Sequence, residues 1–89
     1  MKRIYKFKLS VQHDQTVLLP NGYRILSVGE QQGDITMWVM VDPDLPTTEC
    51  YIRLYGTGHS IKEDMGYENI YLDTVIMSNG LVWHVFEMK

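Results

Sequence analysis

The chain has 89 residues, of which 45% are hydrophobic and 21% charged, so it is long enough for one hydrophobic core and unlike a disordered segment. Its net charge of −3 and scattered basic residues argue against binding to duplex nucleic acid, whose affinity depends on clustered lysine and arginine. No apolar run reaches the roughly 18 residues of a membrane span, and no signal peptide core is present.

Short runs of β-branched and aromatic residues alternate with glycine, proline and asparagine along the chain, a pattern typical of antiparallel strands. We predict a single all-β domain over residues 1–89, a compact antiparallel meander of about six strands that forms a small sandwich or barrel. The strands are expected at 3–9, 16–19 (a short one), 23–30, 35–41, 50–55, 70–77 and 81–87.

The first strand alternates basic residues with Ile4, Tyr5 and Phe7, as edge strands do. We interpret its basic residues as a solvated face, with an anion-binding patch as the alternative. The strand at 35–41 is the most apolar one, and both of its faces look covered. It is therefore expected in the middle of the fold or beneath a partner subunit.

Residues 56–68 form the longest irregular segment, and long loops in compact domains are often functional. Gly56 and Gly58 would let backbone amides approach a ligand, although neither a phosphate loop nor a dinucleotide fingerprint is present. The alternative is a glycine corner with His59 packed or solvated. Within this loop, Ser60 and Glu63 fit a capping box, which predicts one or two helical turns.

The residues around this loop are rich in tyrosine and contain Arg53. Flat rings beside a guanidinium can hold a nucleobase and a phosphate, but the same residue types dominate protein interfaces. Both interpretations remain open. If the segment binds a ligand, the predicted contact residues are Arg53, Tyr55, Gly56, Thr57, Gly58, His59, Tyr67 and His84.

The sequence offers no clear set of catalytic or metal-binding residues. The three histidines lack ligand spacing, so neither a metal nor another cofactor is predicted. Cys50, the only cysteine, cannot form an intrachain disulfide, and it shares a strand face with Ile52 and Leu54, which predicts a buried, inert thiol. Trp83 and His84 point to opposite faces of the last strand, and we expect the tryptophan in the core.

Six segments of the chain resemble a family of small uncharacterised proteins found in phages, prophages and bacteria. They are 1–7, 15–20, 25–28, 37–43, 55–59 and 80–87, and the most specific blocks are Gly-Thr-Gly-His at 56–59 and Trp-His-Val-Phe-Glu at 83–87. Family members usually have proline after this histidine, where the chain has Ser60. The resemblance implies a phage-type accessory protein and assigns no role to any residue.

These observations predict a non-enzymatic, cytoplasmic binding protein. A core of this size supplies only about 3–5 kcal/mol of net stability, so a homo-oligomer is expected. The predicted ligand is small and anionic, such as a cyclic-nucleotide immune signal of the host, which the protein would sequester in an anti-defence role. The alternative is an interaction module that inhibits a host protein by direct contact, and a small nucleotide hydrolase is the third hypothesis.

Overall fold

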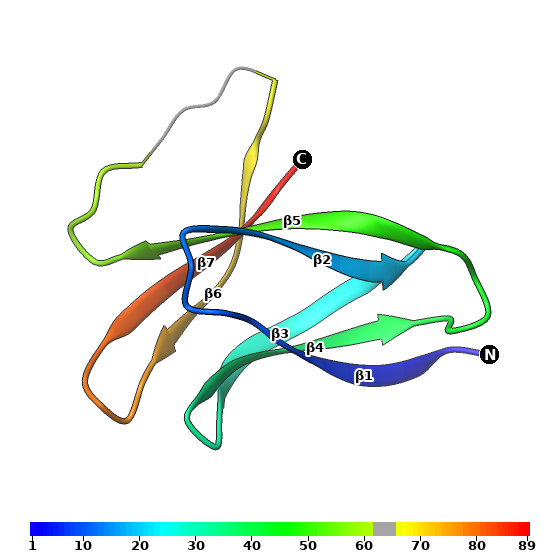
Figure 1. The fold of residues 1–89 in the computed structure, drawn as a ribbon, viewed down its shortest axis with the longest axis horizontal. Coiled ribbons are helices and arrows are strands. Elements are labelled where there is room, and N and C mark those ends of the chain that lie inside the picture. Colours follow the sequence, from blue (N-terminus) through cyan, green and yellow to red (C-terminus); the bar gives the residue numbers. More distant parts are fainter. Residues whose placement is uncertain (62–65) are drawn as a thin grey trace.

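The computed structural model describes residues 1–61 and 66–89, which form seven β-strands and no helix (Figure 1). The strands are β1 (Arg3–Lys8), β2 (Asp14–Pro20), β3 (Arg24–Gln31), β4 (Asp34–Val41), β5 (Thr47–Gly56), β6 (Asn69–Ile76) and β7 (Val82–Met88). The all-β prediction is confirmed. The count of about six was wrong, because each of the seven predicted ranges forms its own strand. The helical turn expected at 60–63 falls partly on residues 62–65, outside the described residues.

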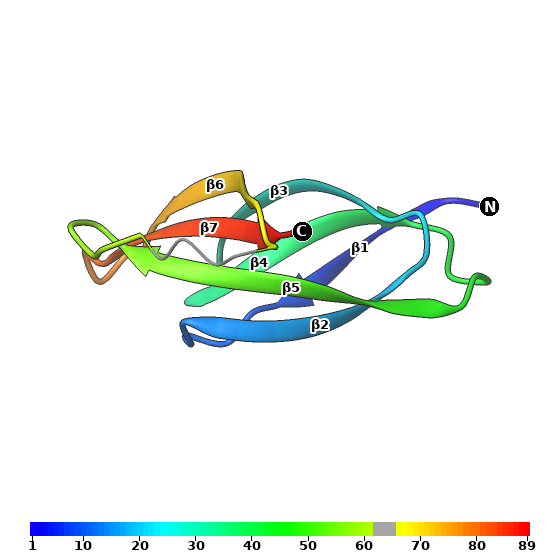
Figure 2. The ribbon, with the colours of Figure 1, turned by 90° about the horizontal axis from the view of Figure 1, so that it is seen from above.

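The strands form two antiparallel sheets, which we call sheet A (order β1-β4-β3) and sheet B (order β2-β5-β7-β6) (Figures 1 and 2). Among the described residues, the hydrogen-bonded ladders end at β1 and β3 in one sheet and at β2 and β6 in the other, so the barrel alternative was wrong. The meander holds only for the β3–β4 and β6–β7 hairpins. The connections from β1 to β2, β2 to β3 and β4 to β5 each lead from one sheet to the other.

The core lies between the two sheets. Successive side chains of a strand point to opposite faces of its sheet, so every second side chain of each strand points into this core. The buried hydrophobic cluster comprises Leu9, Leu19, Val28, Ile35, Met37, Val39, Val41, Cys50, Ile52, Leu54, Val75, Met77 and Val85, with Trp83 packed against it. This confirms the predicted core positions of Cys50 and Trp83. On the opposite face of β4, Thr36 is buried, whereas Trp38 and Met40 are only half-buried.

Two carboxylates join the sheets where β3 lies beside β6. The Val28 amide donates a hydrogen bond to Asp73 Oδ2 at 3.1 Å, and Asp73 follows a register shift in the β6–β7 ladder. The Ser78 amide donates to Glu30 Oε2 at 3.0 Å. Val28 lies on an edge strand and Ser78 in the turn between β6 and β7, so these carboxylates accept from amides that the ladders do not pair.

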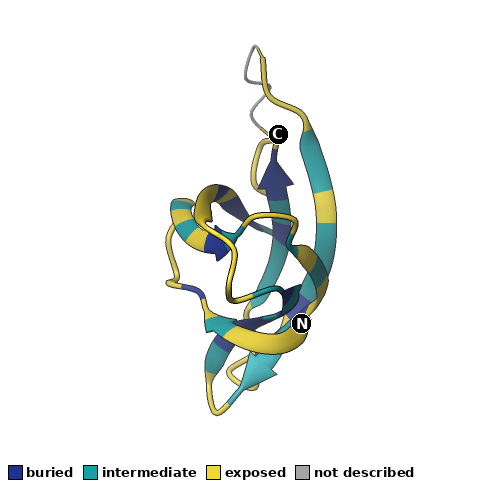
Figure 3. Cartoon of the chain, turned by 90° about the vertical axis from the view of Figure 1, so that its right-hand side faces the viewer, coloured by how far each residue is buried: buried dark blue, intermediate teal, exposed yellow. Residues whose placement is uncertain are grey.

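A third carboxylate, that of Glu87, is buried near the end of β7, the dark blue strand end below the C-terminus in Figure 3. Glu87 is 5% exposed, and its carboxylate accepts hydrogen bonds from the Tyr23 hydroxyl and, at 3.6 Å, from Cys50 Sγ. Lys89 Nζ lies 3.9 Å from its other oxygen. Burial raises the pKa of Cys50 to about 12, and burial together with the bond to Glu87 raises the pKa of Tyr23 above its ordinary value. Both donors therefore keep their protons at neutral pH.

Candidate ligand-binding site

A cavity of about 300 Å³ opens on the outer face of sheet B. It is lined by Asp14, Gln15, Thr16, Tyr51, Ile52, Arg53, Tyr67 and Met88. Strand register explains this grouping: β2 pairs Asp14 with Arg53, and β7 pairs Met88 with Tyr51. Cross-strand partners share a face of a sheet, so these side chains from three neighbouring strands stand side by side. Tyr67, from the segment that precedes β6, completes the wall.

Arg53 forms the buried, charged floor of this cavity. Its Nε donates to Asp14 Oδ1 at 2.5 Å, and its Nη1 donates to the Tyr55 hydroxyl at 3.5 Å. These bonds fix the guanidinium plane before any ligand arrives. The Asp14 carboxylate, which is more exposed than Arg53, offsets the arginine charge. The cavity is therefore lined by an ion pair whose geometry is fixed by hydrogen bonds.

Two tyrosine rings stand at the mouth of the cavity. The ring centroids of Tyr51 and Tyr67 are 6.3 Å apart and the rings are nearly perpendicular, at 84°. The side chains are 40% and 52% exposed, respectively, so ring surface remains available for contact. The Tyr51 hydroxyl donates to Glu49 Oε2 at 2.6 Å, and this hydrogen bond raises the pKa of Tyr51.

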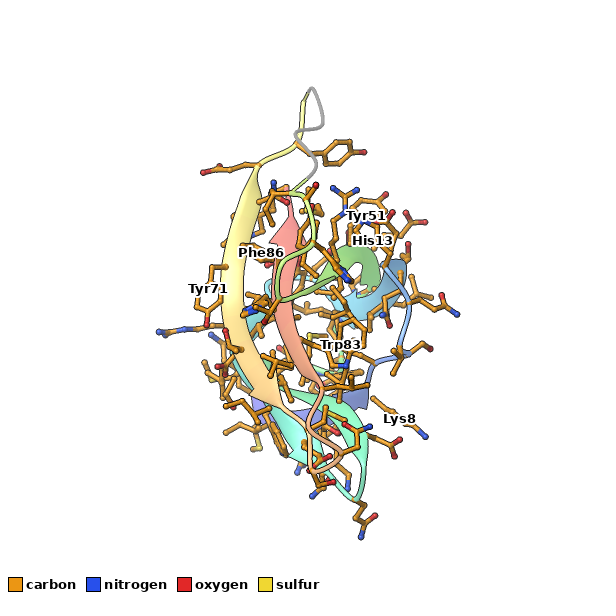
Figure 4. All side chains as sticks on the ribbon, turned by 90° about the vertical axis from the view of Figure 1, so that its left-hand side faces the viewer. Lys8, His13, Tyr51, Tyr71, Trp83 and Phe86 are labelled. Atoms are coloured by element: carbon orange, nitrogen blue, oxygen red, sulfur yellow. The ribbon has the colours of Figure 1, made fainter. Side chains whose placement is uncertain are left out.

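Tyr55 supports the site from below. Its side chain is only 1% exposed and makes edge-to-face contacts with His13 and Phe86, whose ring centroids lie 5.2 and 5.5 Å away. Figure 4 labels His13 and Phe86, and also Tyr51, which lines the cavity. Tyr55 thus acts by packing and by its bond to Arg53, not by touching a ligand in the cavity.

The Gly-Thr-Gly-His segment folds back on itself. The Gly56 amide donates to His59 Nδ1 at 3.2 Å, and the His59 amide donates to the Gly56 carbonyl at 3.1 Å. A Cβ added to Gly56 would lie 2.7 Å from His59 Cε1, so the imidazole occupies the space that a side chain would take. Gly58 has φ +88°, a conformation that favours glycine. The Gly56 amide is therefore bonded inside the loop.

His84 and Thr57 belong to a separate chain of polar side chains. His84 Nε2 lies 2.8 Å from Thr57 Oγ1, and His84 Nδ1 lies 3.0 Å from Thr74 Oγ1. Thr74 Oγ1 is in turn 2.7 Å from the Tyr71 hydroxyl. This chain ties the start of the loop to β7 and β6.

Of the eight predicted contact residues, Arg53 and Tyr67 line the cavity. Gly56 and His59 bond to each other, Thr57 bonds to His84, and Tyr55 is buried. The described residues therefore do not bring the Gly-Thr-Gly-His segment at 56–59 and the arginine to one cavity. The predicted contact residues did not include the other six lining residues, Asp14, Gln15, Thr16, Tyr51, Ile52 and Met88. Within residues 1–61 and 66–89, no three His, Cys, Asp or Glu side chains gather to hold a metal ion.

The comparisons with known proteins identify a family. The model of the family described as Domain of unknown function (DUF7352) matches residues 1–89. The chain belongs to this family. The resemblance to an uncharacterised family is thereby confirmed, while the motif blocks and the phage origin stay predictions. No curated protein and no solved structure matches the chain. The described residues also contain no helix that is long and apolar enough to cross a membrane.

Proposed function

We propose that this protein is a non-enzymatic binding protein whose cavity on sheet B holds a small ligand with a flat ring and an anionic group, as in a nucleotide. The observation that carries the proposal is the juxtaposition of two partly exposed tyrosine rings with a buried, preoriented arginine. Stacking on an aromatic side chain contributes about 1–3 kcal/mol per base, and a guanidinium is well suited to phosphate.

The size of the cavity limits what one chain can enclose. A volume of about 300 Å³ is at the small end of ligand pockets, which span about 300–1,000 Å³. One nucleotide unit suits this space, whereas a cyclic di- or trinucleotide would extend beyond it. In the specific form of the proposal, a second copy of the chain covers the rest of a cyclic nucleotide, and the homo-oligomer sequesters a host immune signal.

Binding without turnover suits the chemistry of the site better than hydrolysis does. Cys50, the one thiol, lies between the sheets, whereas the cavity opens on the outer face of sheet B. Its raised pKa keeps the thiol protonated, and a protonated thiol is a poor nucleophile. Arg53, Tyr51 and Tyr67 supply contacts for a bound group.

Calorimetry tests this proposal directly. The purified protein is titrated with AMP, GMP and a panel of cyclic di- and trinucleotides. We expect heat of binding for at least one, and Tyr67→Ala should weaken it roughly tenfold or more because a stacking surface is lost. The matched control is Tyr71→Ala, an exposed tyrosine of the same sheet that does not line the cavity. A flat response across the panel, or equal losses in both variants, would refute the proposal.

A further inference from the structure

The outer face of sheet A has an apolar centre that residues 1–61 and 66–89 leave partly uncovered. In the β1–β4 and β3–β4 ladders, Met40 stands opposite both Ile4 and Arg24, and Trp38 stands opposite Lys6. These side chains share the face that points away from the core, because their neighbours Met37 and Val39 point inward. Ile4 is 60% exposed. The middle of a central strand is thus left partly open to solvent.

Basic side chains surround this centre. Lys6 and Lys8 come from β1 and Arg24 from β3, all on the same face. The Lys6 ammonium donates to Gln31 Oε1 at 3.0 Å, and Lys8 Nζ lies 3.3 Å from Asp34 Oδ2. A hollow of about 170 Å³ lies among these four side chains. With three basic side chains against the one carboxylate of Asp34, the face has a net positive charge although the whole chain carries a net charge of −3.

We propose that this basic sheet face docks an acidic protein surface that offers apolar side chains to its centre. The basic sheet face is defined by Ile4, Lys6, Lys8, Arg24, Trp38 and Met40. It has the arrangement of protein interfaces, which is an apolar centre with a polar rim, and tryptophan and arginine are the types that most often dominate their energetics. Charge complementarity selects an acidic partner.

A second copy of this chain does not fit as a face-to-face partner. A two-fold contact places the same patch on both sides, so Lys6 and Lys8 of one copy would meet the basic side chains of the other. Such like-charge contacts disfavour association.

Single-stranded nucleic acid fits less well than an acidic protein. Its binding relies on successive aromatic rings, and Trp38 is the one ring among the six residues that define the basic sheet face. Tyr5 and Phe7 alternate with Ile4, Lys6 and Lys8 along β1 and belong to its other face. Ile4 and Met40 instead provide aliphatic surface, which suits protein side chains.

The test uses the isotope-labelled protein and a 12-residue peptide of alternating glutamate and leucine as the probe. We expect amide chemical-shift changes confined to β1, β3 and β4. Lys6→Glu should weaken binding at least fivefold. Arg3→Glu, the same charge change three residues earlier on the other face of β1, should weaken it less than twofold. Ile4→Ser should also weaken binding, whereas Val11→Ser, at an exposed position outside β1, should not.

Three outcomes would overturn this inference. The first is an absence of shift changes on β1, β3 and β4. The second is equal binding of a peptide with serine in place of leucine, which would show that the apolar centre takes no part. The third is tighter binding of a single-stranded oligonucleotide or of phosphatidylserine vesicles through the same residues, which would assign the face to those ligands. Thermal melts of each variant establish that it remains folded.

Discussion

The buried cluster around Glu87 leads to a quantitative prediction for Tyr23→Phe. This substitution keeps the ring and removes the hydroxyl that donates to Glu87. The buried carboxylate would be left with Cys50 Sγ at 3.6 Å and Lys89 Nζ at 3.9 Å. A hydrogen bond to a charged group contributes about 1.5–3 kcal/mol, so we expect the free energy of unfolding to fall by about 2 kcal/mol.

Urea unfolding and thermal melting both measure this loss. For a domain of this length, each kcal/mol shifts Tm by about 4–8 °C, so the melt should shift by roughly 10 °C. The control is Tyr5→Phe, which removes the hydroxyl of an exposed tyrosine and should change the free energy by less than about 0.5 kcal/mol. If Tyr23→Phe were as stable as this control, the bond to Glu87 would not be a stabilising interaction, and our account of the cluster would be wrong.

Three other changes test separate parts of the structure. Burial raises the pKa of Cys50 to about 12, so the thiol loses its proton at a lower pH in the unfolded chain than in the folded one. The free energy of unfolding should therefore fall by up to about 1.4 kcal/mol per pH unit as pH rises from 9 to 12. Urea unfolding at pH 8 and 10 should show this fall, and a Cys50→Ala variant with the same slope would contradict it. Asp73→Ala should cost about 1–3 kcal/mol in a thermal melt because the Val28 amide loses its acceptor, whereas a wild-type Tm would show that the bond is dispensable. Gly56→Ala should expel the His59 ring, which NMR would detect as a moved Hε1 resonance, and an unmoved resonance would refute the contact.

Local patterns predicted the strands well because alternation and turn chemistry are local properties. The inward positions of Cys50 and Leu54, for example, followed from the alternation of a few neighbouring residues. The strand order could not be predicted in this way. It depends on which strands pair across the sequence, and the pairing of β1 with β4 leaves no local signal.

The candidate site was predicted only in part, for two physical reasons. The second strand begins at Asp14, two residues before the predicted start, so this acidic partner of Arg53 was assigned to a polar loop. The two glycines at 56 and 58 suggested open backbone amides. In the structure Gly56 instead makes room for the imidazole of His59, and a glycine pattern alone does not distinguish the two uses.

The interleaved order of the strands bears on how the chain folds. β1 cannot pair until β4 has formed, and β2 must wait for β5, so each pairing closes a loop that contains other strands. β-sandwiches with such non-local pairing typically fold in milliseconds to seconds. During synthesis, at about 5–20 residues per second, the first two strands would emerge well before their partners. The lysines along β1 would then help to keep its bare edge from joining another nascent chain.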